Sequence, residues 1–358
     1  MADGASVAPS PCKMKVLLGL LAGAGATYGI YKLVTASRNR ANQSRNIDVV
    51  NEHCSGKDES TKAVLPGSLL EKVFEFSSIR GRDVRTGDGS SREILSKTPG
   101  KLDPQHLEML LSLLQSNPDT SERMQILVTL GNSAAFSVNQ DFIRETGGLK
   151  IIGNLLSDPV FGIRVQALNA LNNLSMNAKN QEQLKEYIPK VLEMIEISAV
   201  NSDIQLAALR LLTNLSVTND YHHMMRNSIT LFLSLLVVGN EGLQTQVLKV
   251  LVNLSANPEM VDDILRAQAP ASLVLLFDSG TVAAVLCRVL TFVGNLTNWT
   301  PSTPTKEALK RSKDSLYSVL FGDSSQLPSK LSLLLCHPDT EVTAQCLLFK
   351  ELCLQRKM

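Results

Sequence analysis

Apolar residues recur at helical spacing from residue 102 onward. In the segment VQALNALNNL they occupy positions 165, 167, 168, 171 and 174. Intervals of three and four residues place these side chains on one face of an α-helix. Proline-containing turn sequences separate such segments and mark helix starts, as in SNPDTSE, LSDPVFG and CHPDTEV. This part of the chain is therefore predicted to be helical throughout.

One short block recurs five times in the helical region. It reads LGNSAA at 130–135, LNNLSM at 171–176, LTNLSV at 212–217, LVNLSA at 251–256 and VGNLTN at 293–298. Its central Asn returns after 41, 41, 39 and 42 residues, and a period near 40 is typical of armadillo and HEAT solenoids. Each unit reads as a short first helix, a middle helix and a long third helix. We predict an all-α, right-handed armadillo-type α-solenoid of about six repeats.

The repeat boundaries follow from this register. Gly147 and Gly148, after IRET, are expected to separate a first helix from the second helix LKIIGNLL. The first unit lacks a clear first helix and is expected to cap the stack, and the last begins with the polar insertion TPSTPTKEALKRSKDS. The units are predicted at about 102–138, 139–179, 180–220, 221–259, 260–299 and 300–358.

The amino-terminal part differs from the repeats. The run from Val16 to Tyr31 carries no charge, but sixteen helical residues span roughly 24 Å, less than a full bilayer usually requires. Basic residues flank the run, and more of them follow it than precede it: Lys13 and Lys15 before, and Lys32, Arg38, Arg40 and Arg45 after. The positive-inside rule then places the carboxy-terminal part in the cytosol. We predict a tail at 1–12, a transmembrane signal anchor at 13–35, a disordered linker at 36–101 and an armadillo repeat domain at 102–358.

Other interpretations of the apolar run stay open. A secretory signal cleaved near Ala26 would use the same residues, whereas a matrix presequence is disfavoured because the arginines come only after the run. Two GxxxG spacings would permit close helix packing and a homodimer through the anchor, although small residues also simply tune hydrophobicity. The glycines concerned are Gly19, Gly23, Gly25 and Gly29.

Composition narrows the function class. A net charge of +1 argues against a bulk nucleic-acid binder, and 4% aromatic residues require an aliphatic core. The six cysteines contain no C-x-x-C pair and are interpreted as reduced thiols facing the cytosol. Four of the blocks match the glycosylation pattern N-x-S/T, but each lies at the same place in a packed helix, so structure explains the pattern without sugar.

We find no sequence signature of an enzyme. Phosphate-binding glycine loops, nucleophile elbows and H-E-x-x-H helices are lacking, so no catalytic residue, cofactor, metal or small-molecule substrate is predicted. His222 and His223 are the one close histidine pair, and neighbours on a helix point about 100° apart, which does not suit a shared metal. We expect both to lie on the solvated surface.

Three stretches carry a more specific resemblance: LGNSAAFSVNQDFIRETGG (130–148), LTNLSVTND (212–220) and VLKVLVNLSANPEMVDDILRAQ (247–268). They resemble the X-linked armadillo repeat-containing (Alex) family over the anchor and residues 102–299, with little likeness in the linker or around 300–330. The resemblance implies attachment to the mitochondrial outer membrane. It also implies roles in mitochondrial transport, distribution and dynamics through an outer-membrane Rho-type GTPase and kinesin-adaptor machinery. The endoplasmic reticulum membrane is the alternative site.

The same resemblance implies a protein-binding groove. In armadillo stacks the third helices line a concave face, where an Asn ladder can hydrogen-bond the backbone of an extended partner. The matching ladder is Asn132, Asn173, Asn214, Asn253 and Asn295. One turn earlier lie Val128, Asn169, Arg210, Lys249 and Thr291, and Arg288 lies two turns before Asn295. The basic residues favour an acidic or polar partner, and no Trp lies at the earlier turn, which argues against nuclear-localisation cargo. Alternatively, the Asn side chains only tie adjacent helices together.

Two function classes follow from these observations. The first is a non-enzymatic, membrane-anchored armadillo scaffold on the mitochondrial outer surface, with its carboxy-terminal domain in the cytosol. The alternative is a soluble or reticulum-associated armadillo regulator of cell growth or survival that binds a transcription factor. Secretion is a third reading, and it would require a cleaved amino terminus and glycosylated sequons.

Overall fold

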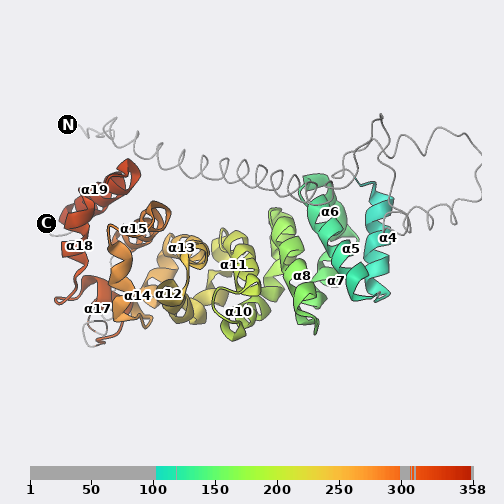
Figure 1. Cartoon of the computed structure of the whole chain (residues 1–358), viewed down its shortest axis with the longest axis horizontal. Helices are drawn as coiled ribbons and strands as arrows, with labels where there is room; N and C mark the ends of the chain where they lie inside the picture. Colours follow the sequence, from blue (N-terminus) through green and yellow to red (C-terminus); the bar gives the residue numbers. More distant parts are fainter. Residues whose placement is uncertain (1–101, 118, 299–306, 308, 310–311, 356–358) are drawn as a thin grey trace, which may run out of the picture. The chain divides into compact units, whose positions relative to one another are not determined.

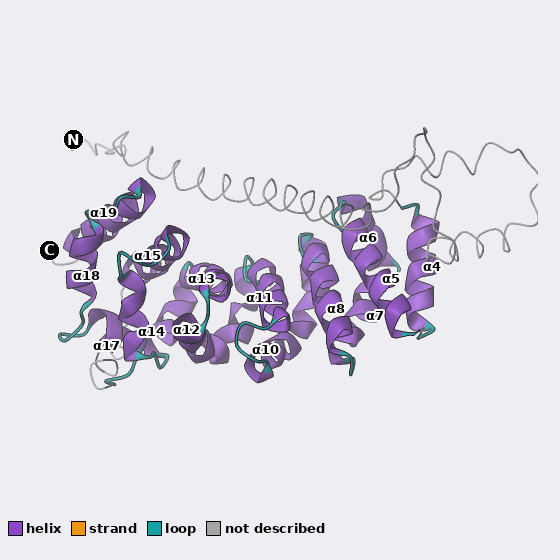
Figure 2. Ribbon diagram, viewed as in Figure 1, coloured by secondary structure: helices purple, strands orange, loops and turns teal. Residues whose placement is uncertain are grey.

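A computed structural model describes residues 102–117, 119–298, 307, 309 and 312–355. These residues form helices joined by short turns (Figures 1 and 2). Within this part of the chain no helix is both long and apolar enough to cross a membrane. The predicted tail, anchor and linker, and with them the four GxxxG glycines, lie outside the described residues.

Each predicted Asn block lies on one of a series of long helices. These long helices are α5 (Thr120–Ser133), α8 (Phe161–Leu174), α11 (Asp203–Leu215), α13 (Glu241–Ser255) and α15 (Ala283–Asn298), followed by α19 (Thr340–Gln355). Each contacts the next one along the chain, so they stack in sequence order (Figure 1). The predicted all-helical solenoid is therefore confirmed.

Shorter elements connect the long helices. The α-helices among them are α4 (Pro104–Gln115), α6 (Ser137–Glu145), α7 (Gly148–Asn154), α9 (Ala178–Leu184), α10 (Ile188–Ile197), α12 (Ile229–Val238), α14 (Val261–Arg266), α17 (Leu316–Phe321) and α18 (Leu327–Leu334). The 3₁₀ segments are η1 (Leu155–Ser157), η2 (Lys185–Tyr187), η3 (Asn219–Ser228), η4 (Pro258–Met260) and η5 (Ala271–Phe277). The repeat pattern predicts α-helices at η3 and η5, whereas the structure has 3₁₀ segments there. The sequence NDYHHMMRNS of η3 contains few strong helix formers.

A single aliphatic core runs through the stack from Leu107 in α4 to Phe349 in α19. In α8, the predicted apolar stripe is buried at Ala167, Leu168, Leu171 and Leu174. No shorter piece of the stack has a complete core, because each long helix buries its apolar face against both neighbours. Burial of these aliphatic faces is what holds the solenoid together.

Acidic and polar caps start several helices where the turn sequences predict them. Asp103 and Asp119 accept hydrogen bonds from the first turns of α4 and α5, and Pro104 occupies the first turn of α4. These groups satisfy backbone N–H donors that have no partner inside the helix. Ser202 and Asn240 do the same for α11 and α13.

Two glycines have structural roles around α7: one allows the turn from α6, and the other allows close packing with the next unit. Gly147 has a φ of 75°, a left-handed conformation that favours glycine, and it lies at the predicted break between α6 and α7. Gly153 faces the ring of Tyr187: a Cβ atom there would lie 2.2 Å from the Tyr187 Cζ atom. The aromatic ring therefore packs directly on the backbone of α7.

We predict that Gly153→Ala destabilises the protein by about 1–3 kcal/mol, the usual cost of forcing an extra methyl group into a packed core. Gly294→Ala is the matched control, because Gly294 is also helical and a Cβ atom there would meet nothing within 4 Å. The control should be neutral or slightly stabilising, since Ala favours the helix over Gly by about 0.5–1 kcal/mol. Urea unfolding followed by circular dichroism measures both changes, and equal stability of the two variants would contradict this packing.

Candidate functional site

The repeated Asn residues lie on one side of the long helices, close to each helix end. Asn173, Asn214, Asn253 and Asn295 are half-buried, whereas Asn132 on α5 is exposed. We name the surface that these five residues and the side chains one and two turns before them share the asparagine face. Because it extends over successive helices, an elongated ligand could contact several of them at once.

Three Asn side chains reach back to the preceding long helix in the same way. In each case Nδ2 donates to a backbone carbonyl and to a Ser hydroxyl of that helix. Asn214 donates to Asn172 O at 3.0 Å and to Ser175 Oγ at 2.9 Å. Asn253 donates to Thr213 O at 3.2 Å and to Ser216 Oγ at 2.9 Å. Asn295 donates to Val252 O at 3.3 Å and to Ser255 Oγ at 3.0 Å. Each bond joins neighbouring repeats.

The first two residues of the row differ from this pattern. Asn173 Nδ2 donates to the Gly131 carbonyl at 2.9 Å, and its Oδ1 accepts from Asn172. Asn132 makes no hydrogen bond through its side chain within the described residues, where no long helix precedes α5. The interpretation that the repeated Asn ties adjacent helices together is therefore confirmed for four of the five residues, Asn132 being the exception. Partner binding by the same residues stays a prediction.

In the second, third and fourth blocks a Ser hydroxyl completes the tie. Ser175, Ser216 and Ser255 are buried, and each donates to the carbonyl three residues earlier while accepting from the next Asn. An Asn and a hydroxyl two residues later are thus both required by packing. This requirement produces the N-x-S/T pattern inside the stack.

The ties determine what the asparagine face can offer a ligand. The Nδ2 groups of Asn214, Asn253 and Asn295 already donate within the stack, whereas their Oδ1 atoms have no hydrogen-bond partner in the described part of the chain. Free amide oxygens accept hydrogen bonds and do not donate them. The row therefore suits a ligand that presents N–H donors.

Basic residues lie beside these acceptors on three successive long helices: Arg210 on α11, Lys249 on α13 and Arg288 on α15. Burial, followed by repulsion from Arg288 and Arg210, lowers the pKa of Lys249 to about 8. The three residues lie on helices that contact one another in order, α11 with α13 and α13 with α15. That the three basic residues share one ligand-binding surface stays a prediction.

The remaining predicted positions vary along the face. Asn169 on α8 is half-buried, Val128 on α5 is 42% exposed, and the Thr291 hydroxyl on α15 donates to the Cys287 carbonyl at 2.7 Å. The amino-terminal part of the face is thus neutral and partly apolar. Positive charge is concentrated from α11 to α15.

A family model described as armadillo-like matches residues 102–321. The chain belongs to the armadillo-like family. A designed armadillo repeat protein in complex with the peptide (KR)4 has a TM-score of 0.58 at 17% identity, over 69% of this chain and 98% of the other. A structure of computationally designed armadillo repeat proteins for modular peptide recognition has a TM-score of 0.58 at 18% identity, over 69% and 99%. At these identities the likeness shows the shared fold.

This armadillo-like stack contains a second polar row that the sequence interpretation missed. Gln140 and Gln181 lie 41 residues apart on α6 and α9, and His222 follows after another 41 on η3. Each donates through Nε2 to a carbonyl at the end of the long helix before it: Ala134 at 2.7 Å, Ser175 at 2.8 Å and Ser216 at 2.7 Å. The 41-residue spacing of these three residues indicates a repeated polar position, but it is hard to recognise in the sequence because the residue changes from Gln to His.

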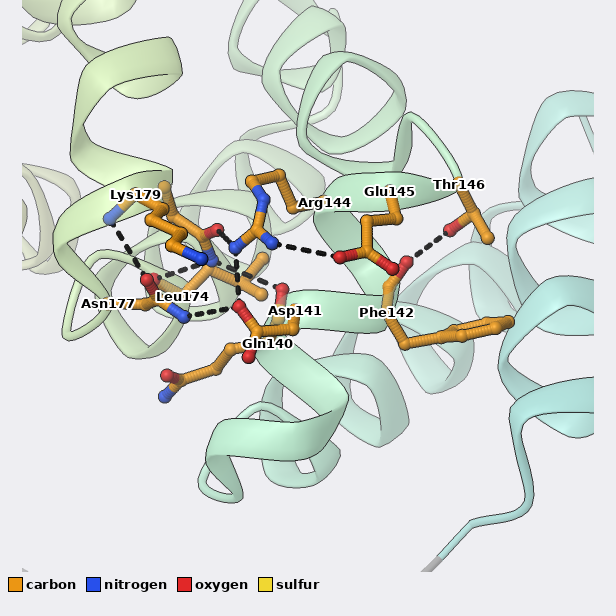
Figure 3. A network of polar contacts seen from close by, with 10 residues as sticks. Gln140, Asp141, Phe142, Arg144, Glu145, Thr146, Leu174, Asn177 and Lys179 are labelled. Carbon is orange, nitrogen blue, oxygen red and sulfur yellow. Dashed lines mark hydrogen bonds and ion pairs between the residues drawn. The ribbon is translucent and has the colours of Figure 1, made fainter.

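Figure 3 shows how the same elements bind their neighbours in the next unit. Arg144 on α6 pairs with Asp141 and donates to Asn180 Oδ1 at 3.1 Å, while Asn177 donates to Asp141 at 3.0 Å. Hydrogen bonds from Arg144 and then Asn177 hold the pKa of Asp141 below its ordinary value. This network joins α6 to α9 of the next unit, and it has a structural role.

The surface placement predicted for His222 is wrong. Its side chain is buried, with Nε2 bonded to the Ser216 carbonyl and Nδ1 accepting from Asn257 Nδ2 at 3.1 Å. The Ser216 carbonyl requires a proton on Nε2, and the Asn257 amide donates to Nδ1, so the ring is neutral with its single proton on Nε2. Burial lowers the pKa of His222, whereas the bond to Ser216 raises it by less. His223 is exposed, as expected. The described residues contain no group of three or more His, Cys, Asp or Glu that could hold a metal ion.

We predict that Asn214→Ala destabilises the full chain by about 1–2 kcal/mol, because buried groups of α8 lose their hydrogen-bond donor. Asn132→Ala is the matched control, since it removes the same side chain from a helix where it makes no tie. Thermal unfolding by circular dichroism should show a lower midpoint for Asn214→Ala alone. Equal midpoints would mean that the tie contributes nothing to stability.

The buried neutral His222 predicts a pH-dependent stability. Because the folded pKa lies below the ordinary value of 6.5, the unfolded chain takes up this proton first, so stability falls as the pH drops through 6.5 and levels off below the folded pKa. His222→Gln should remove this component, since Gln181 makes the equivalent bonds in the preceding unit. Urea unfolding at pH 7.5 and pH 5.5 measures the difference. The same loss of stability in both proteins would contradict this assignment.

Proposed function

We propose that this armadillo-like chain is a non-enzymatic scaffold that binds an extended segment of a partner protein along the asparagine face. The observation that carries the proposal is that the donor and acceptor ends of the Asn side chains have different roles on that face. Amide donors tie the helices together, and amide oxygens with three nearby cations stay on the surface of successive helices. Repeated equivalent groups suit a chain-like ligand better than a compact small molecule.

The designed relatives support this mode of recognition. One is solved with the peptide (KR)4, and another is described as made for modular peptide recognition. The basic residues Arg210, Lys249 and Arg288 would repel such a basic peptide. We therefore propose peptide recognition of the same kind for this chain with the opposite charge preference.

We further propose that the scaffold is anchored to the mitochondrial outer membrane with its repeats in the cytosol. The support is the sequence at 13–35: a short, moderately apolar run with more basic residues after it than before it. By resemblance to the X-linked armadillo family, its partners belong to the outer-membrane Rho-type GTPase and kinesin-adaptor machinery. The scaffold would then regulate mitochondrial transport, distribution and dynamics.

A soluble or reticulum-associated regulator of growth, acting on a transcription factor, is the alternative. It uses the same asparagine face but does not require the anchor. Deletion of Met1–Arg40 separates the two proposals: it leaves the repeats unchanged, abolishes an effect on mitochondrial distribution and preserves an effect on growth.

Protease protection tests the membrane topology. A carboxy-terminally tagged chain should sediment with mitochondria, and protease added to intact organelles should remove the tag. A matrix marker that stays intact is the control. Deletion of residues 1–40 should release the tagged chain into the soluble fraction. A protected or glycosylated tag would overturn the cytosolic placement and favour secretion.

A further inference from the structure

The first unit of the stack differs from the next in its described elements. The second unit has three helices, α6, α7 and α8, and its first helix α6 contacts α9, the first helix of the third unit. In the described part of the first unit, α4 and α5 correspond to the second and third helices of the repeat. A first helix for this unit must therefore come from residues before Leu102, where the described part begins.

The start of α6 exposes apolar side chains toward this end of the stack. Phe136, just before α6, is 43% exposed, and Val138 is 74% exposed. The residues 41 positions later are Asn177 and Lys179, at the start of α9, and Asn177 donates to Asp141 of the preceding first helix at 3.0 Å. By the repeat, Phe136 and Val138 are the residues that face a first helix preceding α6. Such a helix would meet an apolar surface there.

Phe142 extends this apolar surface along α6. It lies four residues after Val138, so both side chains lie on one face of the helix. Figure 3 shows its ring on the side of α6 that points away from Asn177 and Lys179. We name Phe136, Val138 and Phe142 the amino-terminal patch. It faces away from the next unit, on the side where the chain before α4 begins.

A buried amide at the same place is only partly satisfied. Asn139 is 6% exposed, and its Nδ2 donates to the Ser133 carbonyl at 3.0 Å. Its counterpart in the next unit, Asn180, makes the equivalent bond to the Leu174 carbonyl, and its Oδ1 also accepts from Arg144 of the preceding first helix at 3.1 Å. In the described part of the chain Asn139 Oδ1 has no donor. Buried amide oxygens normally have one, so this atom also indicates a neighbouring element.

One segment before Leu102 has the pattern that fits this patch. Residues 65–76 read LPGSLLEKVFEF, with apolar residues at 65, 69, 70, 73, 74 and 76. On a helix these six positions cover one half of the surface, and the charged positions 71, 72 and 75 lie on the other half. The 25 residues at 77–101 can span up to about 80 Å, which is enough to reach α6 from the start of α4.

We propose that residues 65–76 form the first helix of the first unit and pack their apolar half on the amino-terminal patch. The same element supplies the donor that Asn139 Oδ1 lacks. Because the segment is tethered to α4, its effective concentration at the patch is on the order of millimolar, which favours its own chain over a second copy. The armadillo domain then begins near Leu65, and the predicted linker is shorter. This inference does not depend on the asparagine face.

Hydrogen–deuterium exchange of the full chain in lipid nanodiscs tests the proposal. The amides of residues 65–76 should exchange at least about tenfold more slowly than those of 77–101, because helical amides packed on the stack exchange only when they open. The difference should be the same at every protein concentration. Equal exchange in the two segments would overturn the proposal. Protection that disappears on dilution would also overturn it, since the occupant would be a second copy.

Variants locate the contact. Phe136→Asn together with Val138→Lys places the residues of α9 on α6 and should abolish the protection of residues 65–76, as should Val73→Asp in the segment itself. Val217→Lys is the matched control, because Val217 is 69% exposed on the turn after α11. It should leave the protection unchanged, and amides of α8 and α13 should stay protected in all variants. Protection that survives the double substitution would place the segment elsewhere, such as on the bilayer, and would contradict the proposal.

Discussion

The stack depends on satisfying the carbonyl groups at the ends of its long helices. An α-helix leaves its last carbonyls without internal donors, and burying them unpaired would cost free energy. In a solenoid these ends are pressed between neighbouring units, where water has little access. Asn214, Asn253 and Asn295 bring donors from the following long helix, while Gln140, Gln181 and His222 bring donors from the following short helix. Polar ties of both kinds thus accompany the aliphatic core through the stack.

This structural requirement shapes the binding face. An Asn side chain has a donor end and an acceptor end, and a tie that uses the donor leaves the acceptor exposed to a ligand. The face acquires its polarity as a by-product of holding the stack together. The cations of α11, α13 and α15 add the charge that distinguishes this surface from one suited to a basic peptide.

Much of the fold could be predicted from the sequence because two periodicities are superimposed. The three- and four-residue spacing of residues such as Leu168 and Leu171 defines a helical face, and the return of Asn about every 40 residues defines the unit. The second polar row was harder to find, because Gln181 and His222 share a hydrogen-bonding role but not a residue type. His222 also showed that two polar neighbours need not share an environment: one is buried and the other exposed. Charge coupling around Lys249 depends on distances between helices, which one-dimensional spacing does not contain.

The direction of the Asn ties has a consequence for how such an array can change in length. From the second block to the fourth, each carries a donor for the block before it and, in its Ser hydroxyl and neighbouring carbonyl, an acceptor for the block after it. A copied unit inserted beside its original would meet compatible groups on both sides. Duplication of a whole repeat would thus conserve the interface chemistry without compensating substitutions. The short N-x-S/T block can therefore form the same hydrogen bonds with a copy of itself, and the array can grow or shrink by units of about 40 residues.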